Sequence, residues 1–271
     1  MRALPLLAIV LVSACSSKEE APATTTTDTG VADTTTTIVD TGVADTGTDT
    51  MADAPVDTNF PDPFTACTKD PGPGTLPAPM SDGGGDPTGG ADKFTLEMAL
   101  AGYPTTAMGT LKAAITTEHG VIVCTLDEKL APVTVANFVG LARGTRPVMA
   151  GGAWTLKRFY DGLKWHRVIS GFVIQGGDPK GTGSGGPGYD IPVENHIKEP
   201  LGTLAMAGSS PTSPSGSQFY VVIGTGPAAD YNVFGKCDVE VAQAIGDVET
   251  NAKAAPVVPV HMLKIAIARC P

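Results

Sequence analysis

An arginine and a glutamine lie within a largely apolar run from Phe159 to Pro179, which reads FYDGLKWHRVISGFVIQGGDP. Burying a cation or an amide among valine, isoleucine and phenylalanine costs free energy unless the polar group finds a partner. Arg167 and Gln175 are therefore either satisfied inside a core or directed at a ligand. The question for the rest of the chain is which elements position them.

Two other kinds of chemistry do not fit the spacing. His119, His196 and His261 are isolated in the sequence and show no metal-ligand spacing. The glycines from Gly176 to Gly188 contain no GxxxxGK[ST] sequence and no strand-loop-helix frame, so they do not indicate a phosphate cradle. We interpret them as a tight loop beside a groove, and we expect neither a metal nor a cofactor.

The charge is unevenly distributed along the 271 residues. Residues 1–90 carry 13 acidic and 3 basic residues, whereas residues 91–271 carry 15 of each, so the net charge of -10 belongs to the N-terminal part. Repeats such as TTTTDTGVAD and later Pro-Gly stretches offer almost nothing to a core. The sequence predicts a disordered tether over residues 15–90 and a nearly neutral folded domain over 91–271, for which nucleic acid is not an expected partner.

The first residues, MRALPLLAIVLVSAC, have the form of a secretory signal, with one cation, a short apolar run and small residues before Cys15. Their end resembles the lipobox of bacterial lipoproteins. That resemblance implies a signal peptide over 1–14, a lipid on Cys15, and a membrane-anchored protein of the bacterial cell envelope. The alternative is a secreted soluble protein with a fortuitous cysteine. Ser16, where aspartate would mark inner-membrane retention, favours the outer membrane, with the domain facing the periplasm or the surface.

The pattern after residue 91 is that of a mainly β domain. Two apolar runs flank Glu118 to Gly120, as in two strands joined by a tight turn. Residues 131–144 place Val135, Phe138 and Leu141 at helical spacing, with Pro132 early and Gly144 as the stop. Many further short apolar runs separated by turn residues, without a strand-helix alternation, favour an antiparallel barrel or sandwich.

Three motifs carry a more specific resemblance. WHRVISGFVIQGGDPKGTGSGGPGY, GTLAMAGSSPTSPSGSQFYVVI and NVFGKC occur in the order and at spacing compatible with the cyclophilins, which are peptidyl-prolyl isomerases. The resemblance covers about residues 111–271. It implies a closed eight-stranded antiparallel barrel capped by two helices, and it implies a monomer that acts on proline-containing polypeptides without a cofactor.

The resemblance also implies the site. Arg167 matches the catalytic arginine, Phe172 belongs to the apolar floor, and Gln175 binds the substrate backbone, while His166 is implied to be a packing residue. The other residues implied to contact the substrate line the groove or its rim: Val173, Gly183, Ala207, Gly208, Ser209, Gln218, Phe219, Tyr220, Ala229 and Tyr231. Each has a structural alternative, since Arg167 could bridge loops and both phenylalanines could belong to the barrel core.

Several residues depart from the family pattern. Ala228 and Ala229 stand where many members have larger residues, including a tryptophan, and Tyr231 stands at a histidine position. We expect a wider pocket, a weaker grip on the proline ring and poor binding of cyclosporin-type ligands. Gly208 replaces an asparagine, and the loop GSSPTSPSGSQ has one extra residue, which should alter the rim alone.

Four cysteines remain after Cys15, an even number that suits an oxidising compartment. Three pairings are open. We favour Cys124 with Cys237, because both lie in predicted strands, and therefore Cys67 with Cys270. The alternative is four reduced thiols.

The leading hypothesis is a membrane-tethered isomerase that accelerates Xaa-Pro isomerisation in exported proteins. Two alternatives belong to other classes: a non-catalytic module that binds proline-containing peptides, and a structural envelope lipoprotein whose groove is filled. Arg167, Phe172 and Gln175 together favour the enzyme, because a pure binder has less use for a cation at the imide nitrogen.

Overall fold

The computed structural model describes residues 60–72, 85–228 and 231–271. The expected signal peptide, Cys15, most of the expected tether and Ala229 therefore lie outside the described residues. The described residues belong to one compact unit. Within these residues, no helix is both long and apolar enough to cross a membrane.

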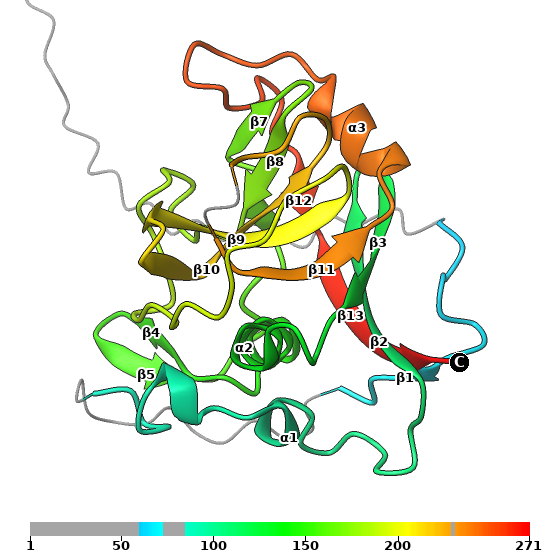
Figure 1. The fold of residues 1–271 in the computed structure, drawn as a ribbon, viewed down its shortest axis with the longest axis vertical. Helices are drawn as coiled ribbons and strands as arrows, with labels where there is room; N and C mark the ends of the chain where they lie inside the picture. The colour runs from blue at the N-terminus through cyan, green and yellow to red at the C-terminus, as the bar shows by residue number, and fades with distance from the viewer. Residues whose placement is uncertain (1–59, 73–84, 229–230) are drawn as a thin grey trace, which may run out of the picture. The chain divides into compact units, whose positions relative to one another are not determined.

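Nine antiparallel strands form the main sheet (Figure 1). Their spatial order is β1 (Thr68–Lys69), β13 (Lys264–Cys270), β2 (Thr110–Thr117), β3 (Gly120–Leu126), β11 (Val233–Cys237), β9 (Thr203–Ser210), β10 (Ser213–Val222), β8 (Val173–Gly176) and β7 (Arg167–Ile169). Two smaller antiparallel pairs consist of β12 (His261–Met262) with β6 (Leu163–Lys164), and of β4 (Val148–Ala150) with β5 (Ala153–Thr155). The mainly β architecture expected from the sequence is confirmed.

The strand pairing differs in detail from the expected closed barrel of eight strands. The main sheet has nine strands in an open order, and among the described strands no ladder joins its two ends, β1 and β7. The extra strand β1 comes from the segment that the composition assigned to the tether. β6, which comes before β7 in the chain, pairs with β12, and Leu163 lies opposite Met262. β12 in turn comes directly before β13 in the chain.

Helix α2 (Pro132–Arg143) confirms the helix expected over this part of the chain. It begins with a proline, and it ends at Gly144, which adopts a φ of 80° that favours glycine. The Glu194 carboxylate accepts the N–H groups of Val133 and Thr134, which satisfies donors that the first turn leaves open. Two shorter helices, α1 (Leu96–Ala99) and α3 (Glu240–Gly246), and a 3-10 turn over Ala91–Lys93 complete the helical part.

The core lies between α2 and the sheet. Phe138 of α2 packs against the rings of Tyr160, Phe219 and Phe234, with centroids 5.2 to 5.3 Å apart. In Figure 1, α2 lies between the sheet and α1, and its contacts with α1 on one side and with β10 and β13 on the other agree with that view. The strands that bear Gln175 and Gln218 are thus supported from within by a packed aromatic cluster.

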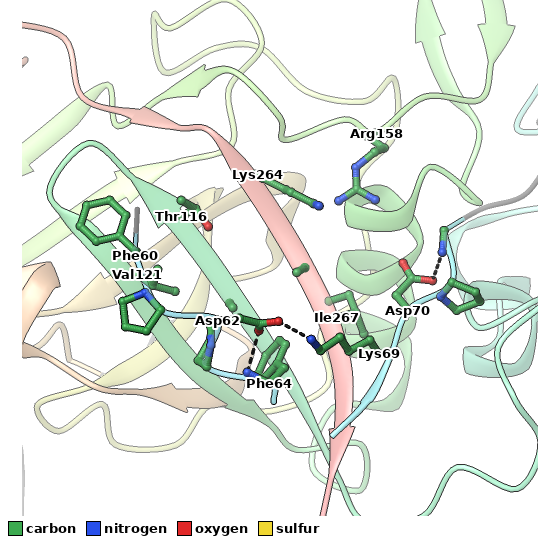
Figure 2. A pocket seen from close by; sticks show the side chains of 16 residues that line it. Phe60, Asp62, Phe64, Lys69, Asp70, Thr116, Val121, Arg158, Lys264 and Ile267 are labelled. Atoms are coloured by element: carbon green, nitrogen blue, oxygen red, sulfur yellow. Dashed lines mark hydrogen bonds and ion pairs between the residues drawn. The ribbon is translucent and has the colours of Figure 1, made fainter. Parts of the chain in front are cut away.

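Residues 60–72 pack on the outer face of β2 and β13, although the composition placed the tether's end near Gly90. Figure 2 shows Phe64 over these strands and the carboxylate of Asp62 bound to Lys69 and to the Phe64 N–H. A cavity of about 540 Å³ remains between this segment and the sheet. Thr68 pairs with Arg269, so the segment extends the sheet by one strand.

Two disulfides close the structure, and they are the pairs that the sequence analysis favoured. Cys67 is bonded to Cys270, which joins the start of β1 to the end of β13. Cys124 is bonded to Cys237, directly across the β3 and β11 pair. Each bond closes a loop of more than 100 residues, so each restricts the unfolded chain strongly.

Candidate active site

Arg167 and Gln175 face each other on β7 and β8. The Arg167 Nη1 donates to the Gln175 Oε1 over 3.3 Å, and the guanidinium carbon lies 6.0 Å from the centre of the Phe172 ring. Both polar side chains are only partly buried. The arginine is therefore at the boundary between a polar row and an apolar surface, rather than enclosed in the core.

Gln218 on β10 continues the polar row. Its Oε1 accepts from the Gln175 Nε2 at 3.1 Å, and its own Nε2 donates to the carbonyl oxygens of Gly183 and Gly185 at 3.0 and 2.8 Å. Because Gln218 is only 6% exposed, these bonds are shielded from water. Three predicted residues, Gln175, Gly183 and Gln218, thus form one connected network next to Arg167.

The glycine-rich loop after β8 winds around a buried carboxylate. Asp178 accepts the N–H groups of Lys180, Thr182 and Gly183 at 2.6 to 2.9 Å. Burial alone would raise the pKa of Asp178, but the backbone N–H donors outweigh it and hold the pKa below the usual 3.8. The loop is a tight turn built on its own aspartate, as its glycine-rich sequence indicated.

A small apolar cluster lies on the other side of Arg167. It consists of buried side chains together with three partly buried ones: Val173, Ala205, Ala207, Tyr220, Val222 and Val233, with Leu130, Phe172 and Tyr231. The structure thereby brings together Phe172, Val173, Ala207, Tyr220 and Tyr231. Leu130, Ala205, Val222 and Val233 were missed. The last three lie two residues from the predicted Ala207, Tyr220 and Tyr231, which is the spacing of side chains on one face of a strand.

Phe219 does not belong to this cluster, which corrects its assignment to the substrate site. Its side chain is fully buried and packs edge-on against Phe138, Tyr160 and Trp165 in the main core. Successive side chains of a strand point to opposite faces, so Phe219 and its neighbour Tyr220 cannot line the same surface. The alternative of barrel core was the right one for this residue.

The rim beside the apolar cluster is built by β9 and by Tyr231. The Tyr231 hydroxyl donates to the carbonyl oxygen of Gly208 over 3.0 Å, and its ring lies edge-on to that of Tyr220, 6.4 Å away. The hydroxyl of Tyr220 in turn donates to the buried carboxylate of Glu199. Next to the rim is a cavity of about 410 Å³ whose lining includes Gln175, Gly183, Gly208, Ser209 and Gln218.

His166 precedes Arg167 and is largely enclosed. Burial is the main cause that lowers the pKa of its imidazole below the ordinary 6.5, and the charge of Arg167 acts in the same direction. Asp178 and Gln218 act in the opposite sense without reversing the shift. A neutral imidazole at neutral pH fits the packing role inferred for His166.

Comparison with known proteins identifies a family. The family model described as cyclophilin type peptidyl-prolyl cis-trans isomerase/CLD matches residues 112–267. The chain is 41% identical over 172 residues to the probable peptidyl-prolyl cis-trans isomerase A of Mycobacterium bovis, covering 59% of this chain and 93% of the relative. It is also 41% identical over 147 residues to peptidyl-prolyl cis-trans isomerase B of Streptomyces anulatus, covering 51% and 82%.

Solved structures support the same relationship. A crystal structure of a cyclophilin type peptidyl-prolyl cis-trans isomerase of Cryptosporidium parvum has a TM-score of 0.52 at 26% identity, and the match covers 60% of this chain and 99% of that one. A second structure of that protein, in the presence of the dipeptide Ala-Pro, has a TM-score of 0.50 at 27% identity and covers 58% and 98%. With a family match over more than half of its residues, the chain belongs to the cyclophilin-type peptidyl-prolyl cis-trans isomerases and is an isomerase.

Proposed function

We propose that this isomerase accelerates Xaa-Pro isomerisation in exported proteins, with Arg167 as the group that stabilises the twisted imide. Rotation about the peptide bond must break its conjugation, against a barrier of roughly 18–20 kcal/mol. A cation that favours the unconjugated nitrogen lowers that barrier without a nucleophile or a metal. The observation that carries the proposal is the position of Arg167, between the Gln175 amide and the Phe172 ring.

The apolar cluster supplies the place for the proline ring. Phe172, Val173 and Tyr220 offer an apolar surface next to the guanidinium, and Tyr231 closes one side of it. Among the described residues, the hydrogen bond from Arg167 to Gln175 uses one of the five N–H donors of the guanidinium. The other donors remain for a substrate carbonyl oxygen. The C. parvum relative whose structure was determined in the presence of Ala-Pro fits a substrate of this class.

The polar cavity takes the peptide next to the proline. Ala207, Gly208 and Ser209 offer backbone groups at its edge, to which an extended peptide can add like a further strand. Gln175 adds an amide that can bond the substrate backbone. A filled groove, as a purely structural lipoprotein would have, does not agree with a cavity of about 410 Å³ at this place.

The cellular setting is part of the proposal. A lipid on Cys15 would anchor the protein to a membrane of the bacterial envelope, and the domain would act there as a monomer on proline-containing segments of exported proteins. The two disulfides support an oxidising compartment, because reduced thiols prevail in the cytosol.

The test is cis/trans exchange of a short Xaa-Pro peptide, measured by NMR exchange spectroscopy with the disulfide-bonded protein and its Arg167→Ala variant. We expect strong acceleration that the substitution reduces by on the order of 10²-fold, as when a single charge-stabilising donor is removed. Arg167→Lys is the matched control for charge, because it keeps the cation but not the planar fork of donors. Peptide binding without acceleration by the unmodified protein would instead establish a docking module.

A further inference from the structure

Two arginines near the end of α2 are fully buried outside the site just described. Arg143 Nη2 lies 2.8 Å from Asp70 Oδ1, and Arg146 Nη2 lies 2.7 Å from Asp86 Oδ2. Both aspartates precede residues 112–267, the region matched by the family model. We call the described residues before that region, 60–72 and 85–111, the N-terminal segment. A buried guanidinium without a partner would be costly, so each ion pair holds part of that segment against the domain.

The remaining contacts of the two arginines differ. Arg143 donates to the carbonyl oxygens of Ala99 and Ala101 at 2.6 and 3.1 Å, so its bonds stay within the N-terminal segment. Arg146 reaches toward the loop after β8: its Nε donates to the hydroxyl of Tyr189 at 3.0 Å. Its guanidinium also lies between the rings of Phe94 and Tyr189, 4.5 and 4.4 Å from their centres.

The hydrogen bonds continue from Tyr189 to β10. The Tyr189 hydroxyl donates to Oδ1 of the buried Asn137 at 3.0 Å, and the Asn137 Nδ2 donates to the carbonyl oxygen of Gly216 at 2.7 Å. A Cβ at Gly216 would lie 2.1 Å from the Tyr189 carbonyl oxygen, so the two segments are in close backbone contact. Arg146, Tyr189, Asn137 and Gly216 thus form one continuous row.

Gly216 lies where β10 departs from regular pairing. The register with β9 shifts between Pro214 and Phe219, so the residues between them lack a regular ladder. Ser215 Oγ accepts the N–H of Gln218 at 3.0 Å, and Asn137 holds the carbonyl of Gly216 two residues earlier. The orientation of Gln218, which bonds both Gln175 and the glycine-rich loop, depends on this short irregular stretch.

We propose that Arg146 is a positioning residue for the substrate groove, linking Asp86 of the N-terminal segment to Gln218 through Tyr189 and Asn137. The inference rests on the proposed function only in taking Gln218 as part of the groove. Loss of the Asp86 charge leaves Arg146 buried and unpaired, which displaces its guanidinium and loosens the Tyr189 hydroxyl. The groove residues then hold the peptide less well, while Arg167, which is linked to Gln218 only through Gln175, keeps its charge.

The test compares Asp86→Asn with the matched variant Asp70→Asn in the full-length, disulfide-bonded protein. Both substitutions remove the negative charge that faces a buried arginine, Arg143 at the end of α2 or Arg146 just after it, so both should lower the resistance to urea. We expect only Asp86→Asn to raise the KM for an Xaa-Pro peptide, by on the order of threefold to tenfold with kcat nearly unchanged. Equal KM values for the two variants would overturn the proposal.

A second variant and a second readout guard against a purely structural effect. Tyr189→Phe keeps the ring beside Arg146 but removes the hydroxyl between Arg146 and Asn137. We expect the side-chain amide resonances of Gln218 in ¹H–¹⁵N NMR spectra to shift in Tyr189→Phe and Asp86→Asn, but not in Asp70→Asn. Unshifted Gln218 resonances in Tyr189→Phe would refute the link. These spectra need no turnover, so they separate this inference from a failure of the isomerase proposal.

Discussion

Tyr231 and Gly208 hold each other in place at the rim of the groove. The Tyr231 hydroxyl donates to the Gly208 carbonyl oxygen over 3.0 Å, and a Cβ at residue 208 would lie 2.9 Å from Cε1 of the Tyr231 ring. A side chain at residue 208 would meet both the Ser213 carbonyl oxygen and the Tyr231 ring, so the glycine leaves room for that ring. A backbone loosened by glycine is restrained again by the hydroxyl of its neighbour.

Removal of that hydroxyl should weaken peptide binding more than turnover. Tyr231→Phe keeps the ring next to Tyr220 but frees the Gly208 segment, so we expect KM to rise about two- to tenfold, the value of one hydrogen bond, with little change in kcat. Steady-state kinetics with an Xaa-Pro peptide measures both constants. A fall in kcat at constant KM would show that Tyr231 acts on the chemical step instead.

Each disulfide should stabilise the fold without taking part in catalysis. The bonds close loops with sequence separations of 203 and 113 residues, so replacing either pair by alanine should lower the free energy of unfolding by about 2–5 kcal/mol. Urea denaturation of Cys67→Ala/Cys270→Ala and Cys124→Ala/Cys237→Ala measures the loss. Isomerase activity should persist at temperatures where each variant stays folded, and its disappearance from a folded variant would contradict this assignment.

The backbone of Ala254 is the one non-glycine position with positive φ among the described residues, at 59°. Its carbonyl oxygen accepts the N–H of Val168, next to Arg167, over 2.7 Å. Because glycine adopts this conformation without a Cβ clash, Ala254→Gly should stabilise the protein by about 0.5–1 kcal/mol. Ala254→Val, which adds a branched Cβ, should destabilise it. Thermal or urea unfolding checks both signs, and destabilisation by glycine would contradict the expectation.

Stability should decrease in mild acid because of His166. Burial lowers its folded pKa below 6.5, so below pH 6.5 the unfolded chain binds the proton more readily than the folded one. The contribution to stability is therefore complete above pH 6.5 and is lost as the pH falls from 6.5 toward the folded pKa. Urea denaturation between pH 7 and pH 5 should show a shallower pH dependence for His166→Gln. The same substitution at the exposed His119 is the control, and an unchanged slope in His166→Gln would exclude His166 as the source.

The amino-acid sequence by itself determined the elements that depend on local pattern. The turn at Glu118 to Gly120, the helix that begins at Pro132, and the strands that carry Arg167 and Gln175 follow from periodicity and turn residues, and the motifs indicated the cyclophilin family. The disulfide pairs were also predicted, because strand positions and an even number of cysteines left few pairings.

Only the tertiary structure decided what the N-terminal segment does. Its proline, glycine and acidic residues are typical of a tether, yet residues 60–72 add a strand to the sheet. Asp70 and Asp86 pair with two buried arginines, Arg143 at the end of α2 and Arg146 just after it. Such contacts join residues far apart in the chain, and local composition carries no information about which distant cation a carboxylate meets. The same holds for Phe219, because which of two adjacent aromatic side chains faces the core depends on where the strand packs.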